Sequence, residues 1–267
     1  MSEPATASGT EARRREILHL ASTSGLASVE ELSARLGVTA STIRRDLARL
    51  RDQGLITRTY GGAAPSVAHP EQSLRQRTGE AFEAKRGIAR WAARQVRPGE
   101  TVMLDAGTTV GALAHELRRC APLTVVTTGL TVLDELADAD DVEVVCLGGS
   151  LRHLSQGFVG PLTEAALERV TADAVFLGAD GVSAEDGICE ADQQQTRLKE
   201  LMARRADRVH VLAHAAKLSR RPFHAWAPMP AGWTLVTDEG ADPSALAPFH
   251  AAGVRVVVTD GEGAEVP

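Results

Sequence analysis

Guanidinium and hydroxyl side chains gather on one side of a helix that the sequence predicts from Thr39 or Ser41 to about Gln53. Successive helical residues are about 100° apart, which places Ser41, Arg44 and Arg45 on the same side. Arginine can donate to guanine edges, and small hydroxyls can bind phosphates. This spacing favours a helix that enters a DNA major groove, although the two arginines could also form a solvated face.

A second group of polar residues follows predicted β-strands in the later part of the chain. The run DAGTT at residues 105–109 joins a strand directly to a helix. Gly107 allows close approach of the backbone, and Thr108 and Thr109 stand beside exposed helix amides. Such a helix start suits a phosphate group, although capping threonines are also common for purely structural reasons. Further polar strand ends occur at Thr127–Gly129, Gly148–Gly149, Asp180–Gly181 and Lys217.

Residues 28–65 must position the first group. They read as two short helices around a turn at Gly37, followed by a small β-hairpin. Ser28 and Glu31 form a capping box at the start of the first helix. The apolar face of the second helix consists of Ile43, Leu47 and Leu50. The two helices therefore pack together and leave the arginines on the opposite side.

Apolar runs that alternate with amphipathic helices must position the second group. The predicted strands lie in ETVMLDAG, LTVVTT, VEVVCLGG, DAVFLGADG, RVHVLA, WTLVTD and VRVVVTD. Helices are expected from about Ala81 to Gln95 and in VGALAHELRR, LTVLDELAD, LTEAALERV, QQTRLKELMARRA and PSALAPFHAA. This alternation indicates βαβ units and a mostly parallel sheet, which binds ligands at the carboxyl ends of its strands.

The segment TIRRDLARLRDQGLITRTYGGA resembles the winged helix-turn-helix signature of DeoR/GlpR-type bacterial transcriptional regulators. The resemblance implies that the helix with the Ile-Arg-Arg-Asp run enters the major groove and that a wing follows it. Tyr60 stands where a histidine is usual. We expect Asp46 to pair with Arg49 or to orient a neighbouring arginine, and Arg13–Arg15 to contact phosphate or form a solvated run. The expected DNA-binding residues are Thr39, Ser41, Thr42, Arg44, Arg45, Arg49, Arg58 and Tyr60.

Segments of the later part resemble the effector domain of the same family, which is related to ribose-5-phosphate isomerase and the coenzyme A transferases. The matching segments are LDAGTT, LGGSLR, VGPLTEAAL, FLGADGV and the region that ends in Lys217. The resemblance implies a Rossmann-like, mostly parallel α/β sensor domain whose pocket binds a phosphorylated sugar or similar metabolite. The candidate effector-binding residues are Asp105, Gly107, Thr108, Thr109, Thr128, Gly149, Arg152, Asp180 and Lys217.

Three departures from the family pattern fall near this pocket. Residues 214–217 read His-Ala-Ala-Lys where Asp-Ser-Ser-Lys is usual, Thr128 replaces an asparagine, and residues 189–191 read Cys-Glu-Ala in place of a Thr-Thr-Pro-like stretch. The ligand could therefore differ from that of other members. His210 and His214 share a predicted strand face, but no third ligand is apparent, so we expect no metal and no cofactor.

The net charge of −6 on the 267 residues is divided unevenly. Residues 1–64 carry nine arginines and seven acidic residues, a balance of +2, whereas the remainder carries 20 basic and 28 acidic residues, a balance of −8. A mildly basic N-terminal part and an acidic remainder fit a protein whose N-terminal part alone contacts DNA. We expect a disordered tail at 1–10, a winged helix-turn-helix domain at 11–64, a linker at 65–80, an effector-binding domain at 81–260 and a tail at 261–267.

The cysteines and lysines are few. Neither a zinc spacing nor a disulfide framework is present, and we expect core packing for Cys146 and a loop position for Cys189. No apolar run approaches the roughly 20 residues that span a bilayer, and the first ten residues lack an apolar signal-peptide region, so we expect a cytoplasmic protein. Only three lysines occur, which makes a functional lysine easy to locate: Lys85, Lys199 and Lys217.

Together these features predict a DNA-binding repressor of a carbohydrate or related catabolic operon, controlled by a small phosphorylated metabolite and without enzymatic activity. It would bind a double-stranded operator as a homo-oligomer, either a dimer or a tetramer. The alternative is a sugar-phosphate isomerase-like enzyme with an appended DNA-binding domain, which needs a positioned general base. Residues 178–182, Gly-Ala-Asp-Gly-Val, lack a second carboxylate, and Glu190 has no evident supporting neighbour in the sequence.

Overall fold

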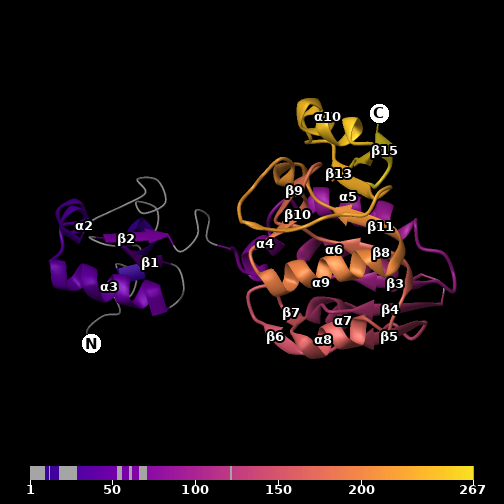
Figure 1. The fold of residues 1–267 in the computed structure, drawn as a ribbon, viewed down its shortest axis with the longest axis horizontal. Helices are drawn as coiled ribbons and strands as arrows, with labels where there is room; N and C mark the ends of the chain where they lie inside the picture. The colour runs from indigo at the N-terminus through magenta and orange to yellow at the C-terminus, as the bar shows by residue number, and fades with distance from the viewer. Residues whose placement is uncertain are drawn as a thin grey trace, which may run out of the picture. The chain divides into compact units, whose positions relative to one another are not determined.

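The computed structural model describes residues 10–11, 13–17, 29–52, 56–59, 62–65, 71–120 and 122–266 (Figure 1). The chain divides into two compact units, Met1–Glu71 and Gln72–Pro267. Each unit has its own hydrophobic core. No helix within the described ranges is long and apolar enough to cross a membrane.

The N-terminal unit contains the predicted helix pair and hairpin. Its described elements are helical residues 13–17, α2 (Val29–Leu36), α3 (Ala40–Asp52) and the antiparallel strands β1 (Ile56–Thr59) and β2 (Gly62–Pro65). Gly37 follows α2 with φ +63°, a left-handed conformation that glycine tolerates. The core of this unit consists of Ile17, Leu32, Ile43 and Leu50. The predicted capping residue Ser28 lies outside the described residues.

An eight-stranded sheet forms the centre of the second unit, in the order β15-β14-β13-β11-β8-β3-β4-β5. Its strands are β3 (Thr101–Leu104), β4 (Leu123–Thr127), β5 (Val142–Cys146), β8 (Ala172–Leu177), β11 (Ala206–Leu212), β13 (Thr234–Asp238), β14 (Arg255–Thr259) and β15 (Glu265–Val266). Every neighbouring pair is parallel except β14 with β15. The seven apolar runs predicted as strands all lie in this sheet, which confirms the mostly parallel α/β class.

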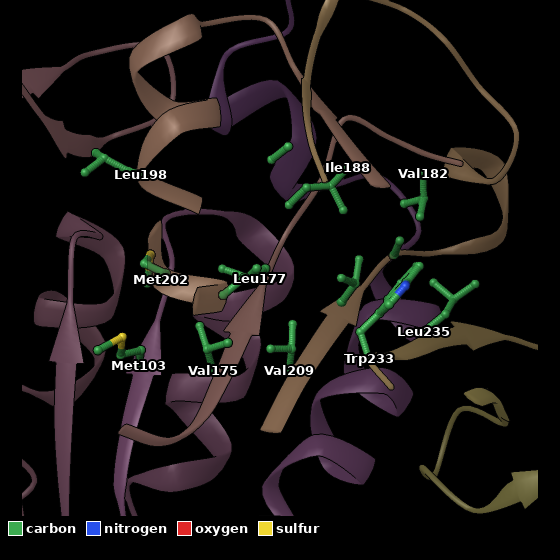
Figure 2. Packing of buried hydrophobic residues seen from close by; sticks show 14 of the residues in the cluster. Met103, Val175, Leu177, Val182, Ile188, Leu198, Met202, Val209, Trp233 and Leu235 are labelled. Carbon is green, nitrogen blue, oxygen red and sulfur yellow. The ribbon is translucent and has the colours of Figure 1, made fainter. Parts of the chain in front are cut away.

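Helices cover both faces of the sheet. On one face α5 (Phe82–Ala93), α6 (Thr108–Leu117) and α7 (Leu130–Leu136) contribute to one core cluster. On the other face α8 (Pro161–Leu167), α9 (Gln193–Arg204) and α10 (Pro243–Ala251) contribute to a second cluster. Figure 2 shows part of the second cluster, with Met202 of α9 beside Met103 and Val175 on neighbouring strands. Strands that are buried on both faces explain why their sequences are continuous apolar runs.

Short elements that the sequence did not predict surround the sheet. The hairpin β6 (Ser150–Arg152) and β7 (Gly157–Val159) follows β5. A separate three-stranded sheet has the order β12-β10-β9 and contains β9 (Gly181–Ser183), β10 (Gly187–Glu190) and β12 (Ala225–Ala227). A single 3-10 turn, η1 (Ala215–Lys217), follows β11. These additions lie at the carboxyl ends of β5, β8 and β11, where they help to build a site.

Two cysteines occupy environments opposite to those we expected. Cys146, expected in the core, is exposed because β5 is the last strand at its edge of the sheet. Cys189, expected in a loop, is buried in β10, the middle strand of the small sheet, and its Sγ donates to the carbonyl of Phe223 at 3.4 Å. Burial raises the pKa of the Cys189 thiol to about 11.

The segments expected to be linker and tail are partly integrated into the second unit. This unit begins at Gln72, and α4 (Leu74–Thr78) is attached to it by a hydrogen bond from the Leu74 amide to the Leu154 carbonyl at 2.8 Å. Near the C-terminus, β15 pairs with β14, and Glu265 accepts a hydrogen bond from Trp91 Nε1 at 2.8 Å. Residues 72–80 and 261–266 therefore pack on the sensor unit.

Candidate functional site

The outer side of α3 carries the residues expected to contact DNA. Ser41, Arg44, Arg45 and Arg49 are exposed, whereas Ile43 and Leu50 on the opposite side are buried. At the start of the helix the Thr39 hydroxyl lies 2.9 Å from the Ser41 hydroxyl and 3.0 Å from the Thr42 hydroxyl. The helix therefore presents a cluster of hydroxyls beside a row of guanidinium groups, as its periodicity predicted.

Asp46 connects α3 to helical residues 13–17. Its carboxylate accepts from Arg13 Nε at 2.7 Å and from Arg14 Nε at 2.9 Å, and the residue is only 2% exposed. Burial tends to raise the pKa of this carboxyl, but the two guanidinium groups outweigh it and hold the pKa below its ordinary value. The expected Asp46–Arg49 pair is therefore replaced by a structural contact that engages Arg13 and Arg14.

The wing is described only in its backbone. Arg58 lies on β1, opposite Ala63 of β2. Tyr60 lies outside the described residues, so the expected wing contacts stay predictions.

A pocket lies where the chain reverses direction across the sheet. From the central strand β3 the chain proceeds to β4 and β5 on one side, and later to β8, β11, β13 and β14 on the other. Open α/β sheets bind ligands at such a switch point, beyond the carboxyl ends of the strands. Residues 106–109 after β3, 178–179 after β8 and 213–214 after β11 line this pocket. The predicted location at the strand ends therefore coincides with a cavity.

Three cationic side chains line one side of the pocket. Lys85 Nζ donates to the Arg77 carbonyl at 2.6 Å, Arg77 Nη1 donates to Asp180 Oδ1 at 2.9 Å, and Lys217 Nζ lies 3.7 Å from the same oxygen. Burial and the nearby charge of Lys217 lower the pKa of Lys85 to about 8. Burial also lowers the pKa of Lys217. Because these cations destabilise one another, an anionic ligand would be stabilised among them.

The floor of the pocket is a buried ionic network around Lys199. Lys199 Nζ lies 2.9 Å from Asp105 Oδ2, donates to the Gly178 carbonyl at 3.0 Å and contacts the Glu190 carboxyl. Burial raises the pKa of Glu190 to about 8, so this carboxyl is mostly protonated at neutral pH. The Asp105 carboxylate raises the pKa of Lys199 against the effect of burial. The network is consistent with an Asp105–Lys199 ion pair and a neutral Glu190.

The amino end of α6 also faces the pocket. Thr108 and Thr109 begin this helix and line the cavity together with Gly107. Within the described residues no side chain caps the first turn of α6. The exposed amides can therefore receive an anion next to the lysines. His214 lines the cavity as well, and burial together with Lys217 lowers its pKa to about 4, so its imidazole is neutral at pH 7.

Five of the expected effector contacts do not line the cavity. The Thr128 carbonyl accepts from the Phe158 amide at 2.7 Å, because the β6–β7 hairpin packs over the end of β4. Gly149 has φ +116°, and a Cβ atom there would lie 2.0 Å from Thr163 Oγ1, so glycine is required for packing. Arg152 lies 3.5 Å from Asp192. Asp105 and Asp180 do not line the cavity either, but each contacts a lysine that does.

Sequence reasoning missed pocket residues that come from helices. Arg77, Glu80 and Lys85 come from α4, α5 and the turn between them, and Gln195 and Lys199 come from α9. The scarcity of lysine was the available signal, because all three lysines of the chain line this one pocket. Within the described ranges, no three His, Cys, Asp or Glu residues could hold a metal ion.

Comparison with known proteins follows the same division of the chain. Residues 13–66 match the DeoR-like helix-turn-helix domain, and residues 80–239 match the DeoR C terminal sensor domain. The chain is 38% identical over 247 residues to the HTH-type transcriptional regulator GlpR of Haloferax volcanii, covering 92% of this chain and 96% of that protein. It is 32% identical over 208 residues to the Glycerol-3-phosphate regulon repressor of Escherichia coli, covering 78% and 82%.

Among solved structures, ribose 5-phosphate isomerase A from Methanocaldococcus jannaschii has a TM-score of 0.37 and 16% sequence identity, covering 50% of this chain and 52% of that chain. The two domain matches together include α3 and every residue that lines the pocket except Arg77. The chain therefore belongs to the DeoR family of transcriptional regulators, with a helix-turn-helix domain followed by a sensor domain.

Proposed function

We propose that this protein represses a carbohydrate or related catabolic operon and that a phosphorylated sugar or similar metabolite controls its DNA binding. The observation that carries this proposal is the arrangement of Arg77, Lys85 and Lys217 around the open amino end of α6. A phosphate ester supplies the negative charge that these groups lack, and its hydroxyls can bind the neighbouring polar side chains.

The DNA-binding role is assigned to α3 and the wing. Arg44 and Arg45 would contact base edges, and the exposed hydroxyl cluster would contact phosphates. The remaining DNA contacts in this proposal are Arg49, Arg58 and Tyr60. Because one DNA-binding unit contacts only a few base pairs, the protein would bind as a dimer or tetramer on repeated or palindromic half-sites.

The effector contacts are revised from those expected by resemblance. Thr108, Thr109 and Lys217 are kept, and Arg77, Lys85 and Gln195 are added because they line the same cavity. Gln195 is 5% exposed, and its Oε1 atom has no hydrogen-bond partner within the described residues, so it suits a hydroxyl donor of the ligand. The relative named as a glycerol-3-phosphate regulon repressor supports an effector of this chemical type.

We assign the pocket to binding rather than catalysis. Glu190 does have a neighbour, Lys199, but that lysine also pairs with Asp105 and is buried beneath the pocket. This closed network stabilises the fold of the pocket floor and engages both of its carboxyl groups, so neither Asp105 nor Glu190 is free to act as a general base. The protein would act in the cytoplasm, where its DNA and small-molecule partners are found.

The test is operator binding at fixed salt, because phosphate contacts make DNA affinity steeply salt-dependent. The probe is DNA from upstream of the protein's own gene, titrated with and without glycerol 3-phosphate and other sugar phosphates. Specific binding that one compound changes would support both parts of the proposal. Specific binding that no phosphate ester changes would contradict the effector class, and binding to upstream DNA no tighter than to unrelated DNA would contradict autoregulation through this operator.

A further inference from the structure

The first helix of the sensor unit is also a wall of its pocket. The sensor unit begins at Gln72, directly after the DNA-binding unit, and α4 follows at Leu74–Thr78. Arg77 of α4 lines the cavity with Lys85 and Lys217. The segment through which the chain enters the sensor unit is therefore in direct contact with the proposed effector site.

Two polar contacts tie Arg77 to the rest of the sensor unit, and each includes one cation, Arg77 itself or Lys85, that a bound anion would attract. Its guanidinium donates to Asp180, and its carbonyl accepts from Lys85 Nζ at 2.6 Å. Lys217, which lies 3.7 Å from Asp180, competes for the same carboxylate. An anion that binds Lys85 and Lys217 would change both partners of Arg77 at once.

The Arg77–Asp180 pair is buried but incomplete. The side chains are 14% and 7% exposed, and they share a single hydrogen bond of 2.9 Å. Arg77 Nε and Asp180 Oδ2 are buried and have no hydrogen-bond partner among the described residues. An arginine and a carboxylate can form two parallel hydrogen bonds, so this pair has an unused donor and an unused acceptor. An anionic oxygen of a ligand could accept a hydrogen bond from Arg77 Nε, and a hydroxyl of the same ligand could donate one to Asp180 Oδ2. Such a ligand would satisfy both atoms.

The short helix α4 depends on its contacts with the rest of the sensor unit. It has only five residues, too few for a helix that is stable by itself. Its other contacts include the Leu74 amide bond to Leu154 and the burial of the Leu74 side chain. Loss of the Arg77 contacts would therefore weaken the attachment of α4.

We infer that Arg77 is both an effector contact and the residue that couples the pocket to the DNA-binding unit: an anionic effector takes the guanidinium from Asp180 and thereby shifts α4. This inference rests on the proposed function. It adds the route by which a ligand in the pocket affects the DNA-binding units. The ligand binds more tightly when Arg77 has left Asp180 than when the two are paired, so its binding favours the shifted position of α4.

The test compares the full-length wild type with Arg77→Gln, in the presence and absence of glycerol 3-phosphate, using upstream DNA as the probe. The matched control is Arg204→Gln, which removes an exposed arginine–glutamate pair within α9, away from the pocket. We expect Arg77→Gln to change DNA affinity about fivefold or more without any phosphate ester, and to abolish the response to it. Arg204→Gln should behave as the wild type.

The outcomes separate this inference from the proposed function. If Arg77→Gln binds DNA as the wild type does and responds equally to glycerol 3-phosphate, the coupling role is overturned and the effector proposal stands. If Arg77→Gln alters DNA affinity while the wild type ignores every phosphate ester, the coupling is supported and the effector class is wrong. Identical, unresponsive proteins would overturn both.

A second variant distinguishes loss of the Arg77–Asp180 contact from misfolding of Arg77→Gln. Asp180→Asn weakens the same contact from the other partner, and we expect it to shift DNA affinity in the same direction as Arg77→Gln. Hydrogen exchange of residues 74–80 should be faster in both variants than in Arg204→Gln, while exchange in α9 stays unchanged. Unchanged exchange in residues 74–80 would show that the ion pair does not hold α4, and would overturn the inference.

Discussion

Helix α3 and the sensor pocket hold positive charge in opposite environments. On α3 the arginines are exposed and the fold does not depend on them, since the core side of the helix is formed by Ile43 and Leu50. In the pocket the cations are buried, and Lys199 is surrounded by the groups that neutralise it. The exposed charges of α3 are therefore available to a binding partner, whereas the buried charge of Lys199 is already neutralised within the protein.

Lys199→Met gives the largest effect expected from this contrast. The change leaves Asp105 buried without its cation, and breaking a buried pair in this way costs about 3–5 kcal/mol of unfolding free energy. Urea unfolding followed by tryptophan fluorescence measures it, because Trp91, Trp226 and Trp233 all lie in the sensor unit.

Glu190→Gln is the matched control for the buried network. Because the pKa of Glu190 is raised to about 8, the amide replaces a carboxyl that is already mostly neutral at pH 7. We expect a loss of about 1 kcal/mol or less. If Lys199→Met were as stable as Glu190→Gln, the buried charge would contribute little, and the contrast with α3 would fail.

His210→Phe should remove a specific sensitivity to acid. The His210 ring stacks on Phe176 with centroids 5.0 Å apart, and neither ring nitrogen has a partner within the described residues. Burial and the charges of Arg208 and Arg255 lower its pKa to about 4, below the ordinary 6.5. The folded state thus binds fewer protons than the unfolded state between these values. The free energy of unfolding is therefore unaffected by protonation of His210 above pH 6.5. It decreases as the pH falls from 6.5 toward 4, because only the unfolded state gains a proton on His210 in that range.

The expected size of this loss is about 3 kcal/mol at pH 4, from about 1.4 kcal/mol per unit of pKa difference. Unfolding measured from pH 7 to pH 4 should decline less steeply in His210→Phe than in the wild type. Parallel curves for the two proteins would mean that His210 does not stay neutral in the folded state.

Arg44→Ala and Arg45→Ala should weaken binding without weakening the fold. Each arginine that contacts a base edge contributes about 1–3 kcal/mol to discrimination between sequences. We expect specific DNA affinity to fall about 5-fold to 150-fold in each variant, while the unfolding midpoint stays near that of the wild type. Titration with operator DNA and with unrelated DNA of equal length measures the two effects. Unchanged preference for the operator would remove these residues from the recognition surface.

The sequence predicted the regular elements and the exposed surface better than the buried site. Seven strands and the helices between them were predicted because long apolar runs and amphipathic periods reflect burial directly. The strands of three or four residues that flank the pocket carry no such period. Cys146 and Cys189 show the same limit, because their burial depends on which strand lies at an edge.

The same distinction applies within the pocket. Thr108, Thr109 and Lys217 were predicted because they follow strands whose ends must converge. Arg77, Lys85 and Lys199 were not, since they lie on helices and only the packing of those helices turns them toward one cavity. A helix period identifies the buried side of a helix, but it does not identify what that side contacts.

The smallest expected effect is the pH dependence of anion binding, and it tests whether the pocket cations act as binding groups at all. The pKa of Lys85 is lowered to about 8, chiefly by burial, and that of Lys217 is also lowered. Lys85 is therefore charged below pH 8 and neutral above it. Sulfate is a suitable probe because its own charge does not change over this range. We expect its affinity to fall on the order of 10-fold between pH 7 and pH 10.

Lys85→Met provides the matched comparison for that profile, because it removes the titrating group and retains an unbranched side chain of similar length. Its sulfate affinity should be lower at pH 7 and should depend less on pH, with the remaining slope due to Lys217. His214 does not contribute, because its pKa of about 4 lies well below the range. Equal slopes in the two proteins would show that Lys85 acts through its contact with the Arg77 carbonyl alone, and would place it with the buried, structural charges rather than with those that bind a partner.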